Sequence, residues 1–159
     1  MSKYSLNVAQ QYGENLESFN SLDEAEQYFL SYRNSLLNRL ENICKNNFSF
    51  MPDYTADSLK QLEKWYFDLF ENNSFDDIGL NQEEFEEIMS IYFGEVAVRN
   101  NDNAKWIVEE FAFVKDKYVL LVNKGAMNMA IDNKCKNWFK KPDNKRHTLL
   151  FREYNKYFS

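Results

Sequence analysis

The chain has 159 residues, of which 44% are hydrophobic and 17% aromatic, and its net charge is −6. This composition excludes a disordered chain and suits one domain of residues 1–159, and two cysteines are too few for a disulfide-stapled secreted scaffold. No apolar stretch approaches the roughly 20 residues that span a bilayer, and the N-terminus lacks the apolar run of a secretory signal, so a cytoplasmic location is expected.

Residues 1–20 are polar and contain Gly13, so we expect a loosely ordered, irregular arm. Ser21 and Glu24 then have the spacing of a capping box, in which each side chain bonds to the backbone N–H of the other. Apolar residues recur after this pair at three- and four-residue steps, which is typical of one face of an amphipathic helix. They are Ala25, Tyr28, Phe29, Tyr32, Leu36, Leu40, Ile43 and Cys44. We expect this helix to end near Asn46.

A second helix is expected after Pro52, because proline disfavours helical backbone at the residue that precedes it. Either Thr55 or Asp57 is its expected N-terminal cap. The apolar stripe of this helix runs from Leu59 to Phe70, and the polar residues that follow it predict a loop.

A third helix is predicted to begin at Asn81, which has Glu84 three residues later in a second capping pattern. Its apolar face continues to Val96 and includes Gly94, which costs a helix interior about 1 kcal/mol relative to alanine. A close approach of another helix or strand at Gly94 would explain its presence there.

The hydrophobic period changes after the polar turn at residues 100–103. Residues 105–108 and 111–114 are rich in aromatic and β-branched side chains, Lys115–Lys117 predicts a hairpin turn, and residues 118–122 and 126–131 predict two further strands. Both faces of these strands are apolar, so one should pack on the helices and the other on the terminal segments. One helical turn within 135–141 and a helix at 146–158 complete an α+β fold with three N-terminal helices on a small antiparallel β-meander and a C-terminal helix.

The search for catalytic residues finds no constellation that supports a mechanism. His147 is the only histidine and lies among Lys145, Arg146 and Arg152, where neighbouring cations would lower the pKa of its imidazole. No nucleophile is signalled beside it. The glycines form no phosphate-binding pattern, and no metal-ligand spacing occurs. We therefore predict no catalytic residue, no cofactor and no metal site.

Six carboxylates form the candidate partner-binding surface. They lie in the loop before the third helix and in its first two turns, where they favour the positive end of the helix dipole, and we expect the helical ones to face mostly outward. Complementary charge would speed the capture of a basic protein. The residues are Asp76, Asp77, Glu83, Glu84, Glu86 and Glu87.

Charge is distributed unevenly along the chain. Residues 1–114 hold 8 Lys and Arg against 21 Asp and Glu, whereas residues 115–159 hold 11 against 4. The two ends could attract different partners, or they could neutralise each other in the folded protein. Aromatic residues between the C-terminal lysines would suit single-stranded nucleic acid, but the sequence pI of 4.9 makes that partner the less favoured one.

Glu95, Arg99 and Trp106 form the second candidate site. A Glu that precedes an Arg by four residues makes a favourable pair on an exposed helix, whereas burial beneath Trp106 would make the pair costly. A buried carboxylate beside an aromatic ring can also act as a general acid. The sequence leaves the structural and the catalytic interpretation of these residues open.

The segment Tyr92–Asn100, followed by Ala104-Lys105-Trp106, resembles small uncharacterised bacterial proteins that share a "YYGEvlvRn…kW" segment. Residues 53–59 and 62–66 are similar to the same group, and the resemblance covers residues 53–125. Some of these proteins are similar to immunity proteins of bacterial toxin systems, which implies a partner-binding role.

Two functional hypotheses follow from the sequence. The first is a non-catalytic protein-binding module, most concretely an immunity-type protein that neutralises a bacterial toxin by binding a basic partner protein, without a cofactor and without a membrane. The alternative is an enzyme of unrecognised type with a site near Glu95, Arg99 and Trp106.

Overall fold

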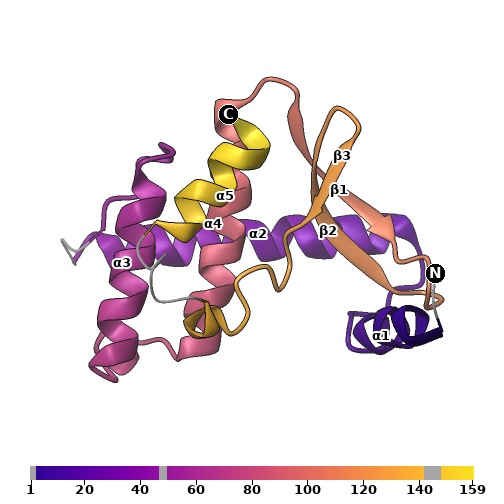
Figure 1. Ribbon diagram of the computed structural model, residues 1–159, viewed down its shortest axis with the longest axis horizontal. Coiled ribbons are helices and arrows are strands. Elements are labelled where there is room, and N and C mark those ends of the chain that lie inside the picture. Colours follow the sequence, from indigo (N-terminus) through magenta and orange to yellow (C-terminus); the bar gives the residue numbers. More distant parts are fainter. Residues whose placement is uncertain (1–2, 47–49, 142–147) are drawn as a thin grey trace.

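The computed structural model describes residues 3–46, 50–141 and 148–159. These residues form an α+β fold with five α-helices, two short 3-10 helices and one antiparallel sheet of three strands (Figure 1). The helices are α1 (Lys3–Glu14), α2 (Leu22–Cys44), α3 (Ser58–Glu71), η1 (Phe75–Ile78), α4 (Gln82–Asn100), η2 (Trp138–Lys140) and α5 (Leu149–Phe158). The strands are β1 (Ala104–Glu110), β2 (Tyr118–Lys124) and β3 (Met127–Ala130).

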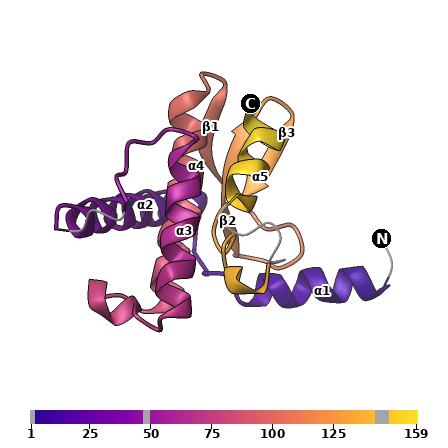
Figure 2. The same ribbon diagram turned by 60° about the vertical axis from the view of Figure 1, so that its left-hand side comes forward.

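Helices α2, α3, α4 and α5 share the main core with one face of the sheet. The long helix α2 contacts α4 and β1, while α3 and α5 pack on α4 (Figure 1). Both views place α1 beside the sheet, on the side of the molecule away from α3 (Figures 1 and 2). The predicted α+β fold, with its meander and C-terminal helix, is therefore confirmed. None of the described helices is long and apolar enough to cross a membrane.

The predicted helix starts are set by side-chain caps. Ser21 Oγ accepts a hydrogen bond of 3.2 Å from Glu24 N at the start of α2, and Asn81 and Glu84 form the complete capping box of α4. Before α3, Thr55 Oγ1 accepts a hydrogen bond from Ser58 N at 3.2 Å, whereas the side chain of Asp57 forms no capping bond. Thr55 is thus the residue that caps the second predicted helix.

The three strands form the predicted meander in the order β1-β2-β3. The first strand is shorter than predicted, because β1 ends at Glu110 and residues 111–114 belong to the connection to β2. Phe111 N donates to Lys117 O at 2.7 Å. This bond closes the hairpin well before the turn expected at residues 115–117, so residues 112–116 form a loop instead of a strand end.

Both faces of the sheet are covered, as the sequence predicts. One face, which includes Leu120 and Val122, joins the main core with the helices. The other face forms a small cluster of Val119 and Leu121 with Leu16, from the segment that follows α1. A terminal segment therefore covers the second face.

The prediction of an irregular N-terminal arm is wrong, because residues 3–14 form α1. Its end lies against the loop after β1, where a Cβ on Gly13 would come within 2.5 Å of the Phe111 ring. Lys117 Nζ donates to Leu16 O at 2.8 Å, and Ser18 forms a β-bridge with the same Lys117.

A buried carboxylate joins the C-terminal segments to α3. Glu63 is fully buried and accepts hydrogen bonds from Trp138 Nε1 at 2.7 Å and from Leu150 N at 3.2 Å. Burial raises the pKa of Glu63 despite these donors. Lys134 and Glu153 form a salt bridge of 2.7 Å that also joins this region. His147 lies outside the described residues.

Candidate functional site

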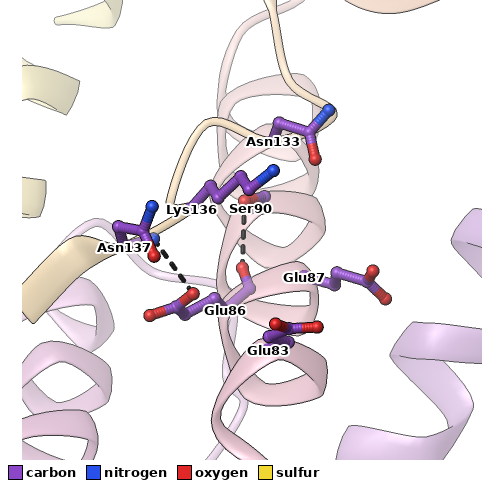
Figure 3. Close-up of a pocket in the computed structure, with 7 residues that line it drawn as sticks. All are labelled: Glu83, Glu86, Glu87, Ser90, Asn133, Lys136 and Asn137. Carbon is purple, nitrogen blue, oxygen red and sulfur yellow. Dashed lines mark hydrogen bonds between the residues drawn. The ribbon is translucent and has the colours of Figure 1, made fainter. Parts of the chain in front are cut away.

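A pocket of about 140 Å³ lies between the first half of α4 and the segment that follows β3 (Figure 3). Three glutamates project from α4, and polar side chains of residues 133–137 face them across the pocket (Figure 3). The lining residues are Glu83, Glu86, Glu87, Ser90, Asn133, Lys136 and Asn137.

Glu86 is the structural anchor of this pocket. Only 3% of its surface is exposed, and its carboxylate accepts hydrogen bonds from Tyr66 Oη at 2.6 Å, Gln82 Nε2 at 3.0 Å and Asn137 N at 3.0 Å. The expectation that Glu86 faces outward is wrong, because the helical step places it on the buried side of α4. Ser90, one turn later, is buried on the same side and accepts a hydrogen bond from Cys135 N at 2.8 Å.

A second pocket of about 160 Å³ adjoins the first and shares Glu87 and Asn133 with it. It opens between α2, the segment after α1 and the end of β3, and two tyrosines of α2 line it with their rings stacked at 6.1 Å. The lining residues are Asn15, Leu16, Glu17, Tyr28, Phe29, Tyr32, Glu87, Asp132 and Asn133. We name the two adjoining pockets, with the carboxylates of Glu17, Glu83, Glu87 and Asp132, the acidic cleft.

The carboxylates at the centre of the acidic cleft are partly removed from water. Burial raises the pKa of Asp132 to about 6, although Leu120 N donates to its Oδ1 at 3.2 Å. Burial raises the pKa of Glu87 as well, and the charges of Glu84 and Glu83 add to the shift. Because desolvation and like charges penalise the ionised form, the attraction of a cation placed between these carboxylates would offset part of that penalty.

The phenols beside these carboxylates are affected in the same way. The pKa of Tyr32 is raised by burial and by the negative charge of Glu87, to which its hydroxyl is hydrogen-bonded, and the pKa of Tyr28 is raised by burial and by Glu17. Both phenols therefore stay neutral and present polarisable ring faces. Lys136 is the one cation that lines either pocket, and within the described ranges it forms no salt bridge.

The six carboxylates predicted as one surface do not lie together. Glu83 and Glu87 line the acidic cleft, and Glu86 lines its first pocket from a buried position. Glu84 forms a salt bridge of 2.6 Å with Arg39. Asp77 lines a separate open pocket with the same Arg39, while Asp76 is exposed in η1.

The cluster of Glu95, Arg99 and Trp106 is closely knit. Trp106 Nε1 donates to Glu95 Oε1 at 2.9 Å, and Arg99 Nε donates to Glu95 Oε2 at 3.2 Å. The Glu95 side chain is 14% exposed and that of Arg99 is 49% exposed. The Arg99 guanidinium also lies 3.5 Å from the centroid of the Tyr54 ring. Both oxygens of Glu95 are thus engaged in contacts that hold β1 and the Tyr54 segment on α4.

Gly94 explains how Trp106 reaches this position. A Cβ at residue 94 would lie 2.2 Å from Cη2 of Trp106. The indole therefore packs directly on the backbone of α4, and the predicted close contact at Gly94 is confirmed. Together with the engaged oxygens of Glu95, this packing supports the structural interpretation of the cluster.

Glu17, Tyr28, Tyr32 and Asp132 are among the contributors to the acidic cleft that sequence reasoning missed. The two tyrosines were assigned to the apolar stripe of α2, and their spacing of four residues was the available signal. Asp132 follows β3 as a lone carboxylate in a basic stretch, so nothing local marks it. In the part of the chain that the structure describes, no three His, Cys, Asp or Glu side chains are grouped so as to hold a metal ion.

Comparison with known proteins identifies the family. The chain is 29% identical over 139 residues to a Bacillus subtilis (strain 168) protein described as "Uncharacterized protein YwmA", and the match covers 87% of this chain and 88% of that protein. No solved structure matches the chain. The family model described as "Uncharacterised protein YwmA" matches residues 18–158, which leaves out all of α1. The chain belongs to the YwmA family.

Proposed function

We propose that this protein is a non-catalytic binding module that receives a basic side chain of a partner protein in the acidic cleft. The observation that carries this proposal is the pair of adjoining pockets that share Glu87, in which partly desolvated carboxylates lie beside stacked tyrosine rings. Such a lining suits a Lys or Arg side chain better than a neutral one.

The chemistry of the lining explains this preference. A guanidinium or ammonium group between Glu87 and Asp132 would form charge-assisted hydrogen bonds, which are about twice as strong as neutral ones. The faces of Tyr28 and Tyr32 would add a cation–π contribution of about 0.5–2 kcal/mol. The volume of the second pocket, about 160 Å³, suits the end of one side chain rather than a folded element.

The immunity-type hypothesis is the most concrete form of this proposal. It is supported by the resemblance of the Tyr92–Trp106 segment to small uncharacterised bacterial proteins, some of which are similar to immunity proteins, and by the acidic character of the first 114 residues. An acidic binding face would steer a basic toxin domain toward the cleft and raise its association rate.

The enzyme hypothesis finds less support in the geometry. Glu95 is the residue on which it depends, and both oxygens of its carboxylate accept bonds from Trp106 and Arg99. Replacing Glu95 with Gln is therefore expected to lower the free energy of unfolding through loss of these contacts.

The binding proposal is tested by affinity capture from the native host. Wild-type protein is compared with a variant that carries Glu87→Gln and Asp132→Asn, and with a control variant that carries Asp76→Asn and Asp77→Asn. Both variants lose two carboxylates, so they have the same net charge. We expect a basic protein to be retained by the wild type and by the control, to be lost from the cleft variant, and to elute as added salt screens the charges.

Two results would contradict the proposal. In the first, every protein that the wild type captures is also captured by the cleft variant, or the wild type captures none. The other is that binding is lost in the Asp76/Asp77 variant and kept in the cleft variant, which would place the binding surface at η1.

A further inference from the structure

Strand β1 lies at one edge of the sheet, next to a groove of about 480 Å³ that separates it from α2. The groove is lined by four consecutive residues of β1, by Leu120 of β2 and by two residues of α2. Because successive side chains of a strand point to opposite faces, a groove lined by four in a row must follow the edge of the strand. The lining residues are Glu26, Leu30, Trp106, Ile107, Val108, Glu109 and Leu120.

The hydrogen-bond pattern shows which backbone groups of β1 face this groove. Phe111 N donates to Lys117 O, and these two residues continue the register in which Ile107 lies opposite Leu121. Since bonded and non-bonded pairs alternate in an antiparallel ladder, Ile107 and Glu109 bond to β2, whereas the N–H and C=O groups of Trp106 and Val108 point away from it.

The far side of β2 agrees with this assignment. Leu120, which lies opposite Val108, uses its C=O to accept from Ile131 N at 2.9 Å, on the β3 side. The outward groups of Trp106 and Val108 therefore have no ladder partner within the described residues. Unpaired groups of this kind form a template for one more strand.

The sequence of β1 is complementary to itself when it is read in the opposite direction. Ile107 is flanked by the apolar residues Trp106 and Val108. Two residues from Ile107, the basic Lys105 lies on one side and the acidic Glu109 on the other. Lys105 and Glu109 are exposed, lie on the same face as Ile107, and form no salt bridge within the described part of the chain.

We propose that β1 pairs with β1 of a second copy of this chain, antiparallel and centred on Ile107. In this register, the outward backbone groups of Trp106 bond to those of Val108 in the other copy, and the reverse pair forms by symmetry. Lys105 of each copy lies opposite Glu109 of the other, so two opposite-charge pairs flank an apolar centre. The product is one continuous sheet of two three-stranded halves.

The charges favour a second copy over an unrelated extended segment. In a pair of β1 strands, Lys105 and Glu109 of one copy meet Glu109 and Lys105 of the other, so all four charges are paired. Leu30, which is 44% exposed, lies beside the groove and supplies apolar surface for the contact. A single strand pair is smaller than the roughly 1,200–2,000 Å² of a typical stable interface, so the association is expected to depend on protein concentration.

Charge reversal tests the register. Sedimentation analysis over a wide range of concentration compares the wild type with Lys105→Glu, with Glu109→Lys, and with the double variant. Each single reversal turns two attractive cross-strand pairs into repulsive ones, so the dimer dissociation constant should rise about tenfold or more. The double variant restores both pairs and should restore dimerisation. Because both side chains are exposed, the thermal midpoint of each monomer should stay close to that of the wild type.

Cross-linking tests the same register independently, in a background with Cys44→Ala. In the proposed dimer, the two copies of Ile107 are a non-hydrogen-bonded pair with Cα atoms about 4.5 Å apart, which is within the range of a disulfide. Ile107→Cys should therefore oxidise to a disulfide-linked dimer. Asn128→Cys, at an exposed position of the other edge strand β3, is the matched control and should remain monomeric.

Several results would overturn the pairing. These are a wild type that stays monomeric throughout, a dimer that ignores the single reversals, a double variant that is not restored, or equal cross-linking at residues 107 and 128. The groove and the acidic cleft are lined by different residues of α2, so failure here leaves the proposed function untouched.

Discussion

Gly94 and Trp106 form a close contact between α4 and the sheet, and the direction of the stability change on Gly94→Ala tests that contact. In an open helix, Gly94→Ala would stabilise the protein by about 1 kcal/mol. Here the new methyl group would lie 2.2 Å from the indole, so we expect Gly94→Ala to lower the free energy of unfolding by about 1–3 kcal/mol. Urea denaturation measures it.

The combination of Gly94→Ala with Trp106→Phe provides the control for this prediction. A smaller ring leaves room for the methyl group, so the double variant should lose less stability than the sum of the two single variants. Strict additivity, or a stabilising effect of Gly94→Ala alone, would show that the indole does not pack on the α4 backbone.

Asp132 gives a prediction about pH. Its pKa is about 6 in the folded protein, against 3.8 as the ordinary value, so between about pH 4 and pH 6 the folded state binds more protons than the unfolded state. Stability then falls as the pH rises through this window. We expect Asp132→Asn to be more stable than the wild type at pH 7 and to lose this advantage below about pH 4, as followed by thermal unfolding across the pH range.

Asp53 is the matched control, because its pKa is lowered by hydrogen bonds from Thr55 N and Thr55 Oγ1. The stability that Asp53 contributes therefore rises with pH, opposite to the trend for Asp132. Asp53→Asn should be less stable than the wild type at pH 7, and the difference should vanish as the pH falls below the folded pKa of Asp53. The same pH trend in both variants would contradict the assignment for Asp132.

At the residue scale, the sequence predicted what depends on neighbours in the chain. A glycine inside an apolar helix indicated a close contact, and Gly94 has one. The raised pKa of Asp132 could not be predicted, because the groups that bury it come from other segments, including Tyr32 and Leu16. Glu86 was predicted to face outward because nothing in its side chain distinguishes it from the neighbouring glutamates. Only its hydrogen bond with Tyr66, from another helix, shows that it faces inward.

At the scale of single elements, the caps carry the clearest consequence. Asn81 Oδ1 accepts from Glu84 N at 2.8 Å, and Glu84 Oε1 accepts from Asn81 N at 3.2 Å. We expect Asn81→Ala to lower the free energy of unfolding by about 1 kcal/mol. Denaturant titration measures it, with Asn72→Ala, at the C-terminal end of α3, as the comparison. A loss no larger than that of Asn72→Ala would show that the box does not stabilise α4.

The elements that sequence reasoning found are those with strong periodicity. Helices α2 and α3 each have a buried stripe and a polar start, whereas α4 follows a polar cap but is buried on all sides from Ile88 to Gly94. The type and the beginning of all three were predictable. Helix α1 was missed because polar residues dominate it and Gly13 suggested a break. The end of β1 was missed because residues 111–114 are as apolar as a strand, although Phe111 and Val114 lie against the end of α1 and residues 112–113 are exposed.

At the scale of the whole molecule, Glu63 links the C-terminal segments to the helical core. Replacing Glu63 with Gln puts an amide –NH₂ against one of two fixed N–H donors, Trp138 Nε1 or Leu150 N. We expect a loss of about 1–3 kcal/mol of stability and faster hydrogen exchange in α5 than in α2. Uniform exchange throughout the protein would contradict this local role.

The uneven charge of the chain is only partly resolved by the fold. The C-terminal cation Lys134 pairs with Glu153, within the same third of the sequence. Within the described residues, no salt bridge joins a basic residue after position 114 to an acidic residue before it. Among the described residues, the two ends therefore do not neutralise each other through salt bridges, and Glu17, Glu83, Glu87 and Asp132 of the acidic cleft form none.

The attachment of the N-terminal segment has a consequence for biosynthesis. Residues 16–19 are held by Lys117 and by the carbonyl of Asp116, about a hundred positions further along the chain. At about 5–20 residues per second, the ribosome needs several seconds or more to supply those partners. During that interval α1 has no docking surface, so residues 3–19 leave the ribosome several seconds before they can reach their native place.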